Sequence, residues 1–302
     1  MTGAYTDLSV YDYPRTACPL CAGESIRTKY TITRYSLPFN IDMCRRCGFM
    51  FMNPRFNDGV VSSFYNEDYY RGNAEYSYYD EREAEKFARH VWDKRIKVLN
   101  RYARGGNFLD IGAAFGGLMR AASRYFTPYG IELSPYAGTE ARRRFGSAVH
   151  IGTLDNHPFS ENFFSAITMI EVIEHLPDPK TAVRECYRLL KKGGVLALQT
   201  ANMDGMQTKL LKDRYAYFMP GHLSYFTRKN CTSLLHDAGF SRVKVFLPVE
   251  FGLLPKLMKS RYTFTSWLHY LRWLKITRYH LLSKLHYGNF AATSSMVVYA
   301  IK

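Results

Sequence analysis

The sequence predicts an α/β protein in which helices cover both faces of a doubly wound sheet and a small metal-binding ribbon precedes it. Apolar, strand-like segments alternate with helical segments at short spacing from residue 105 onwards, a pattern typical of parallel sheets. A glycine-rich turn follows the first of these strands, and two cysteine pairs lie near the N-terminus. We therefore expect a ribbon over 1–59, a connector with a first helix over 60–104, and the α/β domain over 105–302.

The composition is that of a globular protein with a basic surface. Hydrophobic residues make up 47% of the 302 residues and charged residues 22%, which suffices to bury a core and argues against disorder. Lys and Arg exceed Asp and Glu by 15, which favours anionic partners. No apolar run is long enough to span a bilayer, and the first residues lack a signal-peptide pattern. We expect a cytoplasmic protein and exclude membrane-spanning, secreted and fibrous classes.

Four of the six cysteines form two Cys-x2-Cys pairs, Cys18 with Cys21 and Cys44 with Cys47. In a cytosolic protein each such turn aims two thiolates at one ion, so the pattern predicts a tetrahedral, structural Zn²⁺ site. A redox role would need a βαβ pattern around one pair, and none is visible. The metal would stabilise a ribbon too short to bury much core. The other two cysteines, Cys186 and Cys231, stand alone in segments expected to be helical.

An aromatic, acidic connector leads into a helix expected over 79–102, which ends before Gly105 and Gly106. The expected strands that follow cover 107–112, 128–133, 148–152, 164–170, 193–200 and 242–248. The expected helices cover 116–126, 135–145, 179–190 and 229–238. A last strand over 294–302 follows a long insertion at about 249–290. We expect this last strand to join the edge of the sheet in antiparallel orientation.

The glycine-rich turn, NFLDIGAAFGG over 107–117, follows a buried strand and opens a helix. Such a turn lets the backbone approach an anionic ligand at the N-terminus of the helix. Glu132 ends the next strand, where a carboxylate can accept both hydroxyls of an adenosine ribose. The dinucleotide fingerprint lacks its middle glycine because Ala114 stands there, and the pattern D-x-G-x-G-x-G meets the same departure but gains Asp110 and Gly116. The glycines alone leave both cofactor classes open.

Further segments decide between these cofactors: CPLC, CRRCGFMFMNPRF, LDIGAAFGG, YGIELSP, EVIEHLPDP, RLLKKGGVLALQTAN and GHLSYFT. Together they resemble the class I S-adenosylmethionine-dependent methyltransferases. In particular, the chain is similar to bacterial members that carry an N-terminal zinc ribbon and accompany cell-surface saccharide synthesis. The resemblance implies a Rossmann-like fold with a terminal antiparallel strand, S-adenosylmethionine as cofactor, and methyl transfer as the reaction.

By position, the resemblance assigns the cofactor site to Asp110, Gly112, Ala114, Gly116, Glu132, Leu154, Asp155 and Met169. The turn residues would line the methionine end of the cofactor, Glu132 would hold the ribose, and Leu154 and Met169 would flank the adenine. The chain departs from the family at Ala114, usually a glycine, and at Thr153, where an acidic residue commonly contacts the adenine amine. Asp155, two residues further on, is the candidate to replace that acid.

A second cluster of polar residues comes from Glu171, Glu174 and His175, which follow a strand at the edge where open α/β sheets bind ligands. Two carboxylates and an imidazole can hold a divalent cation such as Mg²⁺, or supply a general base. This E-x-x-E-H pattern is similar to that of ubiquinone-pathway O-methyltransferases and small-RNA 2′-O-methyltransferases, where it binds a divalent metal. His222 in GHLSYFTR resembles the further histidine of the RNA enzymes. A purely structural role for the segment is the competing interpretation.

The last part of the chain is basic and aromatic. Residues 248–302 contain eight Lys or Arg and a single acid, Glu250, with Trp267, Tyr270 and Trp273 interleaved. Such a segment suits an anionic membrane surface or a lipid-linked or phosphorylated substrate. A lid, a dimer contact or a packed helical cap with snorkelling cations fits equally. The net charge is compatible with nucleic acid, but the sequence holds no recognition motif for it.

These observations favour an O-methyltransferase that transfers the methyl group of S-adenosylmethionine to a sugar hydroxyl of a nucleotide- or lipid-linked saccharide, as in polysaccharide biosynthesis. The catalytic candidates are Glu171, Glu174, His175 and His222. Two alternatives stay open at this point. One is an RNA 2′-O-methyltransferase with a divalent-metal site. The other is a non-catalytic adaptor built on the zinc ribbon, which the departures at Ala114 and Thr153 would suit.

Overall fold

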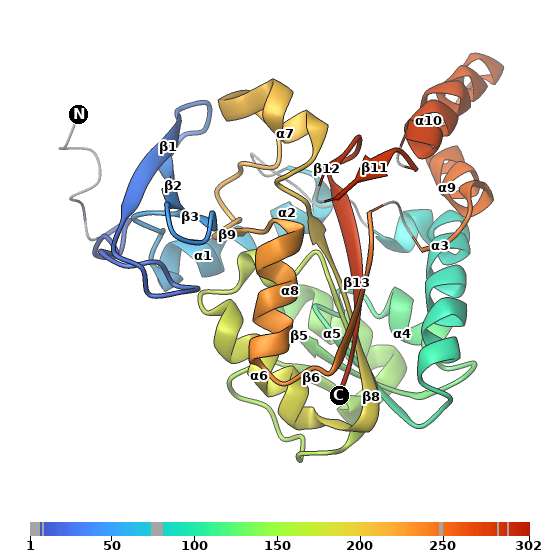
Figure 1. The fold of residues 1–302 in the computed structure, drawn as a ribbon. Helices are drawn as coiled ribbons and strands as arrows, with labels where there is room; N and C mark the ends of the chain where they lie inside the picture. The colour runs from blue at the N-terminus through green and yellow to red at the C-terminus, as the bar shows by residue number, and fades with distance from the viewer. Residues whose placement is uncertain (1–6, 8, 74–80, 248–249, 283, 289) are drawn as a thin grey trace.

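A computed structural model describes residues 7, 9–73, 81–247, 250–282, 284–288 and 290–302. Within these residues a seven-stranded sheet forms the centre of the molecule, a four-stranded sheet lies beside it, and a helical insertion stands at the opposite side (Figure 1). The predicted doubly wound α/β fold is confirmed. No helix among the described residues is long and apolar enough to cross a membrane.

The small sheet combines the N-terminal ribbon with a strand from far along the chain. Strands β1 (Ile26–Ile32), β2 (Phe39–Cys44) and β3 (Met50–Met52) form an antiparallel meander. Strand β9 (Ser224–Tyr225) then pairs with β3, so that Met50 faces Tyr225. Met50, Met52 and Tyr225 pack in one buried cluster with Phe39 and Ile41. The ribbon is therefore held against the α/β domain by shared hydrogen bonds and a shared core.

Three helices connect the small sheet to the large one. Helix α1 (Asp58–Phe64) and helix α2 (Glu67–Arg71) begin at Asn57 and Asn66, whose side chains accept hydrogen bonds from the first turn. Helix α2 ends at Gly72, which adopts a left-handed conformation. Helix α3 (Glu81–Tyr102) is the long helix expected over 79–102, the first two residues of which lie outside the described part.

The large sheet has the strand order β10-β13-β8-β7-β4-β5-β6. Its strands are β4 (Asn107–Ile111), β5 (Thr127–Glu132), β6 (Val149–Ile151), β7 (Phe164–Ile170), β8 (Leu190–Ala201), β10 (Arg242–Phe246) and β13 (Ser295–Ile301). The strands β4 to β8 are parallel, and β13 runs antiparallel to both of its neighbours. The carboxyl ends of β4, β5 and β7 therefore meet at one edge, where the sequence placed the ligand site.

The expectation that the last strand lies at the sheet edge is wrong, because β13 is inserted between β8 and β10. The reason is burial. Met296 to Ala300 form a continuous run of buried apolar residues, which suits a strand that is hydrogen-bonded on both sides. Strand β10, which alternates between exposed and half-buried residues, takes the edge instead.

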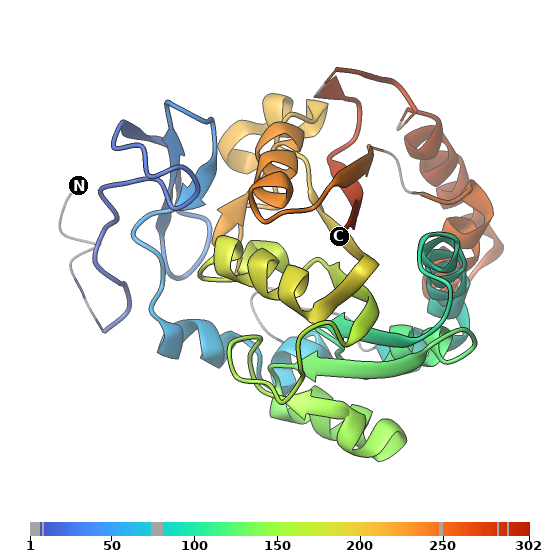
Figure 2. The ribbon, with the colours of Figure 1, turned by 60° about the horizontal axis from the view of Figure 1, so that its bottom comes forward.

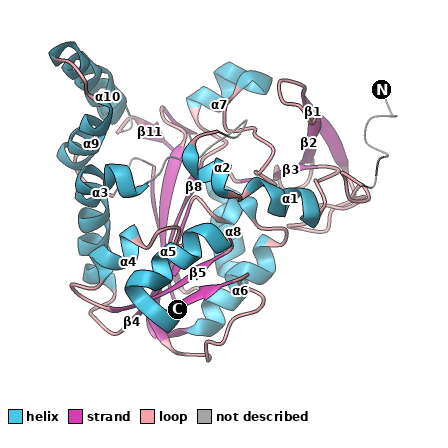
Figure 3. Cartoon of the chain, turned by 180° about the vertical axis from the view of Figure 1, so that it is seen from behind, coloured by secondary structure: helices cyan, strands magenta, loops and turns pink. Residues whose placement is uncertain are grey.

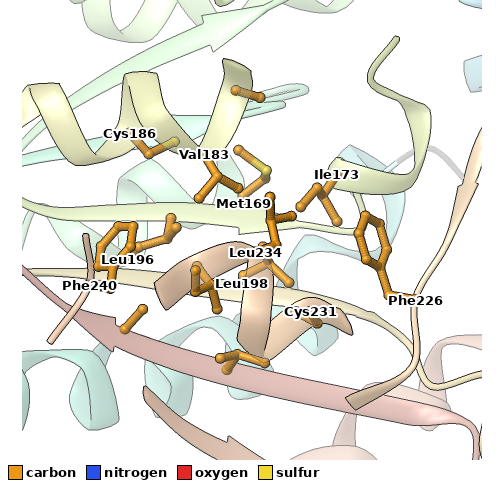
Figure 4. Packing of buried hydrophobic residues seen from close by; sticks show 14 of the residues in the cluster. Met169, Ile173, Val183, Cys186, Leu196, Leu198, Phe226, Cys231, Leu234 and Phe240 are labelled. Atoms are coloured by element: carbon orange, nitrogen blue, oxygen red, sulfur yellow. The ribbon is translucent and has the colours of Figure 1, made fainter. Parts of the chain in front are cut away.

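Helices cover both faces of the large sheet. On one face, α6 (Pro179–Leu189) and α8 (Arg228–Asp237) pack against β7 and β8, and Figure 2 shows these two helices side by side. Figure 4 shows this layer from close by. On the other face, α3 and α4 (Gly117–Ala122) pack against the sheet, with α5 (Pro135–Phe145) further along. Helix α4 is shorter than the expected 116–126, because the chain turns at Ser123 and buries Phe126 beneath the sheet.

The insertion before β13 is helical, as expected, and stands apart from the sheet. Helix α9 (Leu253–Ser260) packs on α3, and α10 (Leu271–Leu282) projects away from the body of the molecule (Figures 1 and 3). A hairpin of β11 (His286–Tyr287) and β12 (Phe290–Ala291) returns the chain to β13. This hairpin and helix α7 (Met206–Leu211) had no counterpart in the sequence analysis.

Candidate active site and cysteine cluster

The four paired cysteines meet at the base of the small sheet. Their sulfur atoms lie within 4.8 Å of one another, with 3.7 Å between Cys18 and Cys47 and 3.6 Å between Cys21 and Cys44. These separations exclude disulfides, whose sulfurs are about 2.05 Å apart. They match the edge of about 3.8 Å that four Zn–S bonds of about 2.3 Å give a tetrahedron. The cluster is therefore compatible with the predicted structural zinc ion.

The glycine-rich turn joins β4 to α4 and meets Glu132 at the end of β5. Gly112 adopts a φ of 78° and lies against Val172, where a Cβ would be 2.6 Å from a methyl carbon. Ala114 also has a positive φ, of 45°. Its backbone N–H donates to Glu132 Oε2 at 2.8 Å, which compensates for a conformation that alanine rarely adopts. The departure from the family pattern is thus accommodated by a hydrogen bond to the proposed ribose ligand.

Glu132 is buried, and three groups hold its carboxylate. Besides Ala114, the backbone N–H of Ser134 donates to Oε1 at 2.8 Å and the Tyr70 hydroxyl donates to the same oxygen at 3.1 Å. Burial raises the pKa of Glu132, while these hydrogen bonds oppose the shift. A buried carboxylate at the carboxyl end of β5 is suitably placed to accept hydrogen bonds from a ligand, with Tyr70 as a neighbour.

The remaining predicted cofactor residues lie in different surroundings. Asp110 is buried at the end of β4 and accepts a hydrogen bond from Thr168 at 2.7 Å. Leu154 is buried, whereas Asp155 is exposed. Met169 is fully buried among Ile173, Val183 and Leu234 (Figure 4), in the layer between the sheet and helices α6 and α8. Their cofactor roles stay predictions.

Three of the four catalytic candidates come together beyond β7. Glu174 and His175 belong to a short 3-10 turn, η2 (Ile173–His175), and His222 lies just before β9. One carboxylate oxygen of Glu174 and one ring nitrogen of each histidine lie within 4.8 Å of one another. The backbone N–H of Leu223 donates to the Glu174 carbonyl at 2.7 Å, which fixes the two segments together. We call Glu174, His175 and His222 the acid–histidine cluster.

The hydrogen bonds of the histidines define their tautomers. His175 Nδ1 lies 2.8 Å from the Gly221 carbonyl oxygen, and His222 Nδ1 lies 2.8 Å from the Tyr217 carbonyl oxygen. Because a carbonyl oxygen only accepts, both Nδ1 atoms carry the hydrogen in the neutral rings. Each Nε2 therefore keeps a lone pair. This is the tautomer that a metal ligand or a general base needs.

The electrostatics of the cluster favour neutral imidazoles. Burial lowers the pKa of His175 to about 4, and burial together with the neighbouring His175 lowers the pKa of His222 well below its usual range. Burial, the charge of Glu171 and a side-chain hydrogen bond with Glu171 raise the pKa of Glu174 well above its usual range, which favours the protonated carboxyl group. The Tyr217 hydroxyl donates to Glu174 Oε1, whereas Oε2 is buried without a hydrogen-bond partner among the described residues. Among the described residues, the Glu174 carboxyl group thus keeps one buried oxygen that a ligand can reach with a hydrogen bond or a coordinate bond.

Glu171 stands outside this cluster. It adopts a φ of 55°, and its exposed side chain accepts a hydrogen bond from Gln199 on β8. Gln199 in turn accepts from the buried Arg95 of α3, which also pairs with Glu250 at 2.9 Å. Glu171 therefore ends a polar chain that leads to the start of the insertion, and it acts on Glu174 through its charge and a side-chain hydrogen bond.

Three tyrosines of the connector, which no sequence motif predicts as site residues, surround the site. Tyr65, at the end of α1, contacts His175 Nδ1 at 2.8 Å, and Tyr70 contacts Glu132. Burial, and after it the charges of Glu132 and Glu174, raise the pKa of Tyr69 to about 12. Tyr69 therefore lies near both carboxyl groups. The acidic, aromatic composition of the connector was the available signal, although it specified no contact. The tyrosines thus connect Glu132, at the predicted cofactor site, to the acid–histidine cluster.

Comparison with known proteins identifies the domain that carries this site. The family model described as a methyltransferase domain matches residues 81–245, more than half of the chain. An uncharacterised protein of Methanocaldococcus jannaschii is 24% identical over 157 residues, which cover 51% of this chain and 74% of that protein. The ubiquinone biosynthesis O-methyltransferase of Pseudomonas putida is 33% identical over 117 residues, which cover 36% of this chain. The match spans only about half of that relative, 48% of its length.

Solved structures agree on the fold. A SAM-dependent methyltransferase from Archaeoglobus fulgidus superimposes with a TM-score of 0.51 at 15% identity, over 74% of this chain and all of that one. The family match extends from α3 to β10 and includes the glycine-rich turn, Glu132, and the Glu174 and His175 turn. The chain belongs to this methyltransferase domain family and is an S-adenosylmethionine-dependent methyltransferase.

Proposed function

We propose that the protein is an O-methyltransferase whose acceptor is a sugar hydroxyl of a nucleotide- or lipid-linked saccharide. The observation that carries the proposal is the acid–histidine cluster. One carboxylate oxygen of Glu174 and one ring nitrogen of each of the two neutral imidazoles lie within 4.8 Å of one another. Hydroxyl groups are poor nucleophiles until a group takes their proton, and this cluster offers such groups beside the cofactor edge.

The residues present fit S-adenosylmethionine. The glycine-rich turn between β4 and α4 can bring the backbone close to a ligand, and the buried Glu132 carboxylate can accept from ribose hydroxyls at the end of β5. The cofactor supplies an electrophilic methyl group on a sulfonium. The chain contributes the alignment of the acceptor with that methyl group and the exclusion of water, which Tyr65, Tyr69 and Tyr70 support by covering the site.

The acid–histidine cluster also fits a divalent cation. A cation held by Glu174, His175 and His222 would satisfy the buried Glu174 Oε2 and lower the pKa of a bound hydroxyl. Two nitrogen donors and one oxygen donor suit a transition metal such as Mn²⁺, Fe²⁺ or Zn²⁺ better than Mg²⁺, which prefers oxygen ligands. The role of Glu171 as a further ligand stays a prediction: its side chain interacts with both Gln199 and Glu174, but the group of ligand atoms within 4.8 Å of one another comes from Glu174, His175 and His222. At the cysteine cluster we propose a structural Zn²⁺.

The histidines act as follows in the absence of a cation. The Gly221 and Tyr217 carbonyls hold the two Nδ1–H groups, so Nε2 of either ring can accept the acceptor hydroxyl's proton. The positive charge of the resulting imidazolium favours ionisation of the neighbouring Glu174, which in its ionised form would stabilise that imidazolium. Tyr217 fixes the orientation of that carboxylate by donating to Oε1.

The saccharide acceptor is supported by the resemblance to saccharide-associated methyltransferases and by the net charge of +15, which suits a diphosphate. The similarity to a ubiquinone biosynthesis O-methyltransferase supports oxygen as the methylated atom. Because the chain is a methyltransferase, the adaptor alternative is no longer favoured. The RNA 2′-O-methyltransferase remains a second candidate, since His222 joins Glu174 and His175 as it does in that resemblance.

Two measurements test the proposal. Calorimetric titration with S-adenosylhomocysteine should show micromolar binding in the wild type and in His222→Ala. Labelled methyl transfer to nucleotide- and lipid-linked saccharides should then fall by about 10²-fold or more in His222→Ala. His286→Ala, an exposed histidine of the insertion, is the matched control. Undiminished transfer in His222→Ala contradicts the role of the cluster, and transfer to RNA with a steep salt dependence selects the second candidate.

A further inference from the structure

We propose that the projecting face of the insertion docks on an anionic lipid bilayer. This surface, which we call the insertion face, consists of the turn before α10, the outer side of α10 and the residue stretch that follows it. Its apolar members are Trp267, Leu268, Leu271, Leu274, Leu281 and Leu285. Its cations are Arg272, Lys275, Arg278 and Lys284, all of them exposed. The inference goes beyond the proposed function and does not depend on it.

The apolar side chains of this face are exposed to a degree that is unusual for their size. Trp267 is 76% exposed, Leu274 69% and Leu285 61%. Leu274 and Leu281 are seven residues apart on α10 and so share one side of the helix. His280 is buried and Trp273 is half-buried, with its indole N–H donating to Ser260 at 3.0 Å. Helix α10 therefore packs by one side and presents leucines to solvent by the other.

Charge selects the kind of partner. Residues 251–302 contain no acidic residue. The acid that precedes them, Glu250, has a fully buried side chain paired with Arg95. The exposed leucines are thus accompanied by cations alone. Apolar side chains that can enter the acyl boundary, flanked by Lys and Arg that reach anionic headgroups, are the two contributions to interfacial membrane binding.

Two other occupants fit less well. A second copy of the chain, placed face to face, would bring the same cations opposite one another, which disfavours association. Nucleic acid would satisfy the cations, but it would leave Leu271, Leu274 and Leu281 without an apolar environment. A bilayer that carries anionic headgroups meets both requirements at once, and α10 stands clear of the body so that a flat surface can approach it (Figures 1 and 3).

The test uses the full chain and sedimentation with vesicles, without cofactor or acceptor. Vesicles of phosphatidylcholine with about 30% phosphatidylglycerol should bind the protein, and pure phosphatidylcholine vesicles should bind it at least ten-fold more weakly. The triple variant Leu271→Ser, Leu274→Ser and Leu281→Ser should lose at least ten-fold in partitioning. Leu210→Ser, at a similarly exposed leucine of α7, should not change it.

A second pair of variants separates charge from apolar contact. Lys275→Gln with Arg278→Gln should weaken binding by about ten-fold or more, since each cation near an anionic surface contributes about five-fold. Lys191→Gln with Lys192→Gln, at two exposed lysines of β8, is the control. Absence of binding to the anionic vesicles overturns the proposal. Wild-type binding by the triple leucine variant also overturns it. The same holds if the wild type is a dimer in solution and the triple variant is a monomer, or if both proteins prefer RNA to vesicles. Methyl transfer enters none of these readouts, so failure here leaves the proposed function standing.

Discussion

The buried ion pair between Arg95 and Glu250 should be a large determinant of stability. The Arg95 Nε and Glu250 Oε1 atoms are 2.9 Å apart, and the two side chains are 7% and 0% exposed. Glu250 Oε2 has no partner among the described residues, and the Tyr299 hydroxyl donates to Oε1 only from 3.4 Å. Arg95→Met keeps a long side chain of apolar character but removes the charge. It leaves the Glu250 carboxylate buried without its hydrogen-bonded cation, with only the charge of Lys256 acting on it, and breaking a buried pair in this way costs about 3–5 kcal/mol of unfolding free energy.

The double variant distinguishes a specific ion pair from general damage. In Arg95→Met with Glu250→Met no buried charge remains, and two apolar side chains can pack between α3 and the insertion. Replacing both partners of a buried pair is often neutral or stabilising, so we expect the double variant to recover at least half of the loss. Urea unfolding followed by circular dichroism measures the four proteins of the cycle. A loss below about 1 kcal/mol in Arg95→Met, or a double variant no more stable than Arg95→Met, would refute this reasoning.

Three further predictions concern separate parts of the molecule. Removal of the metal by a zinc chelator should release one equivalent of Zn²⁺ and expose the turns over residues 18–21 and 44–47 to proteolysis, because the ion would join these two turns. Protein that contains no zinc and resists the protease contradicts this. Tyr70→Phe removes the hydroxyl that donates a hydrogen bond to Glu132 Oε1. The affinity for S-adenosylhomocysteine, measured by calorimetry, should therefore rise by about two- to ten-fold. A fall in affinity would show that the hydroxyl helps to bind the ligand. Asp178 caps α6 by accepting from Lys180 and Thr181, and Asp178→Ala should cost about 1 kcal/mol. Partial burial raises the pKa of Asp178, but hydrogen bonds from Thr181 and Lys180 outweigh it and lower the pKa below 3.8. The stabilisation by the ionised Asp178 side chain is therefore present above pH 3.8 and should disappear as the pH falls through the lowered pKa. Urea unfolding at several pH values would detect this loss.

Local patterns made most of the fold predictable. The bounds of β7 and α5 coincide with the expected ones because an apolar run and a proline at the first helical position mark them within the sequence itself. The cysteine cluster was predictable for the same reason, since each pair is a single turn. The position of β13 was predicted wrongly: its own apolar run suits an interior strand, but which strands pair with it depends on the distant segments β8 and β10. Strand β9, with only two residues, carries no pattern of its own and exists through its pairing with β3.

The candidate site shows the same division between local and distant information. Glu171 and Glu174 stand three residues apart and looked equivalent in the sequence, but the backbone gives their side chains different exposure to solvent. The positive φ of Glu171 leaves its side chain exposed beside Gln199, while the η2 turn buries Glu174 completely. His222 joins Glu174 because Leu223 donates to the Glu174 carbonyl and Ser224 pairs with β3 of the ribbon. The small sheet thus helps to position a candidate catalytic histidine. Loss of a metal held by the cysteine cluster should consequently reduce methyl transfer as well as stability, although the cluster lies in a separate part of the chain.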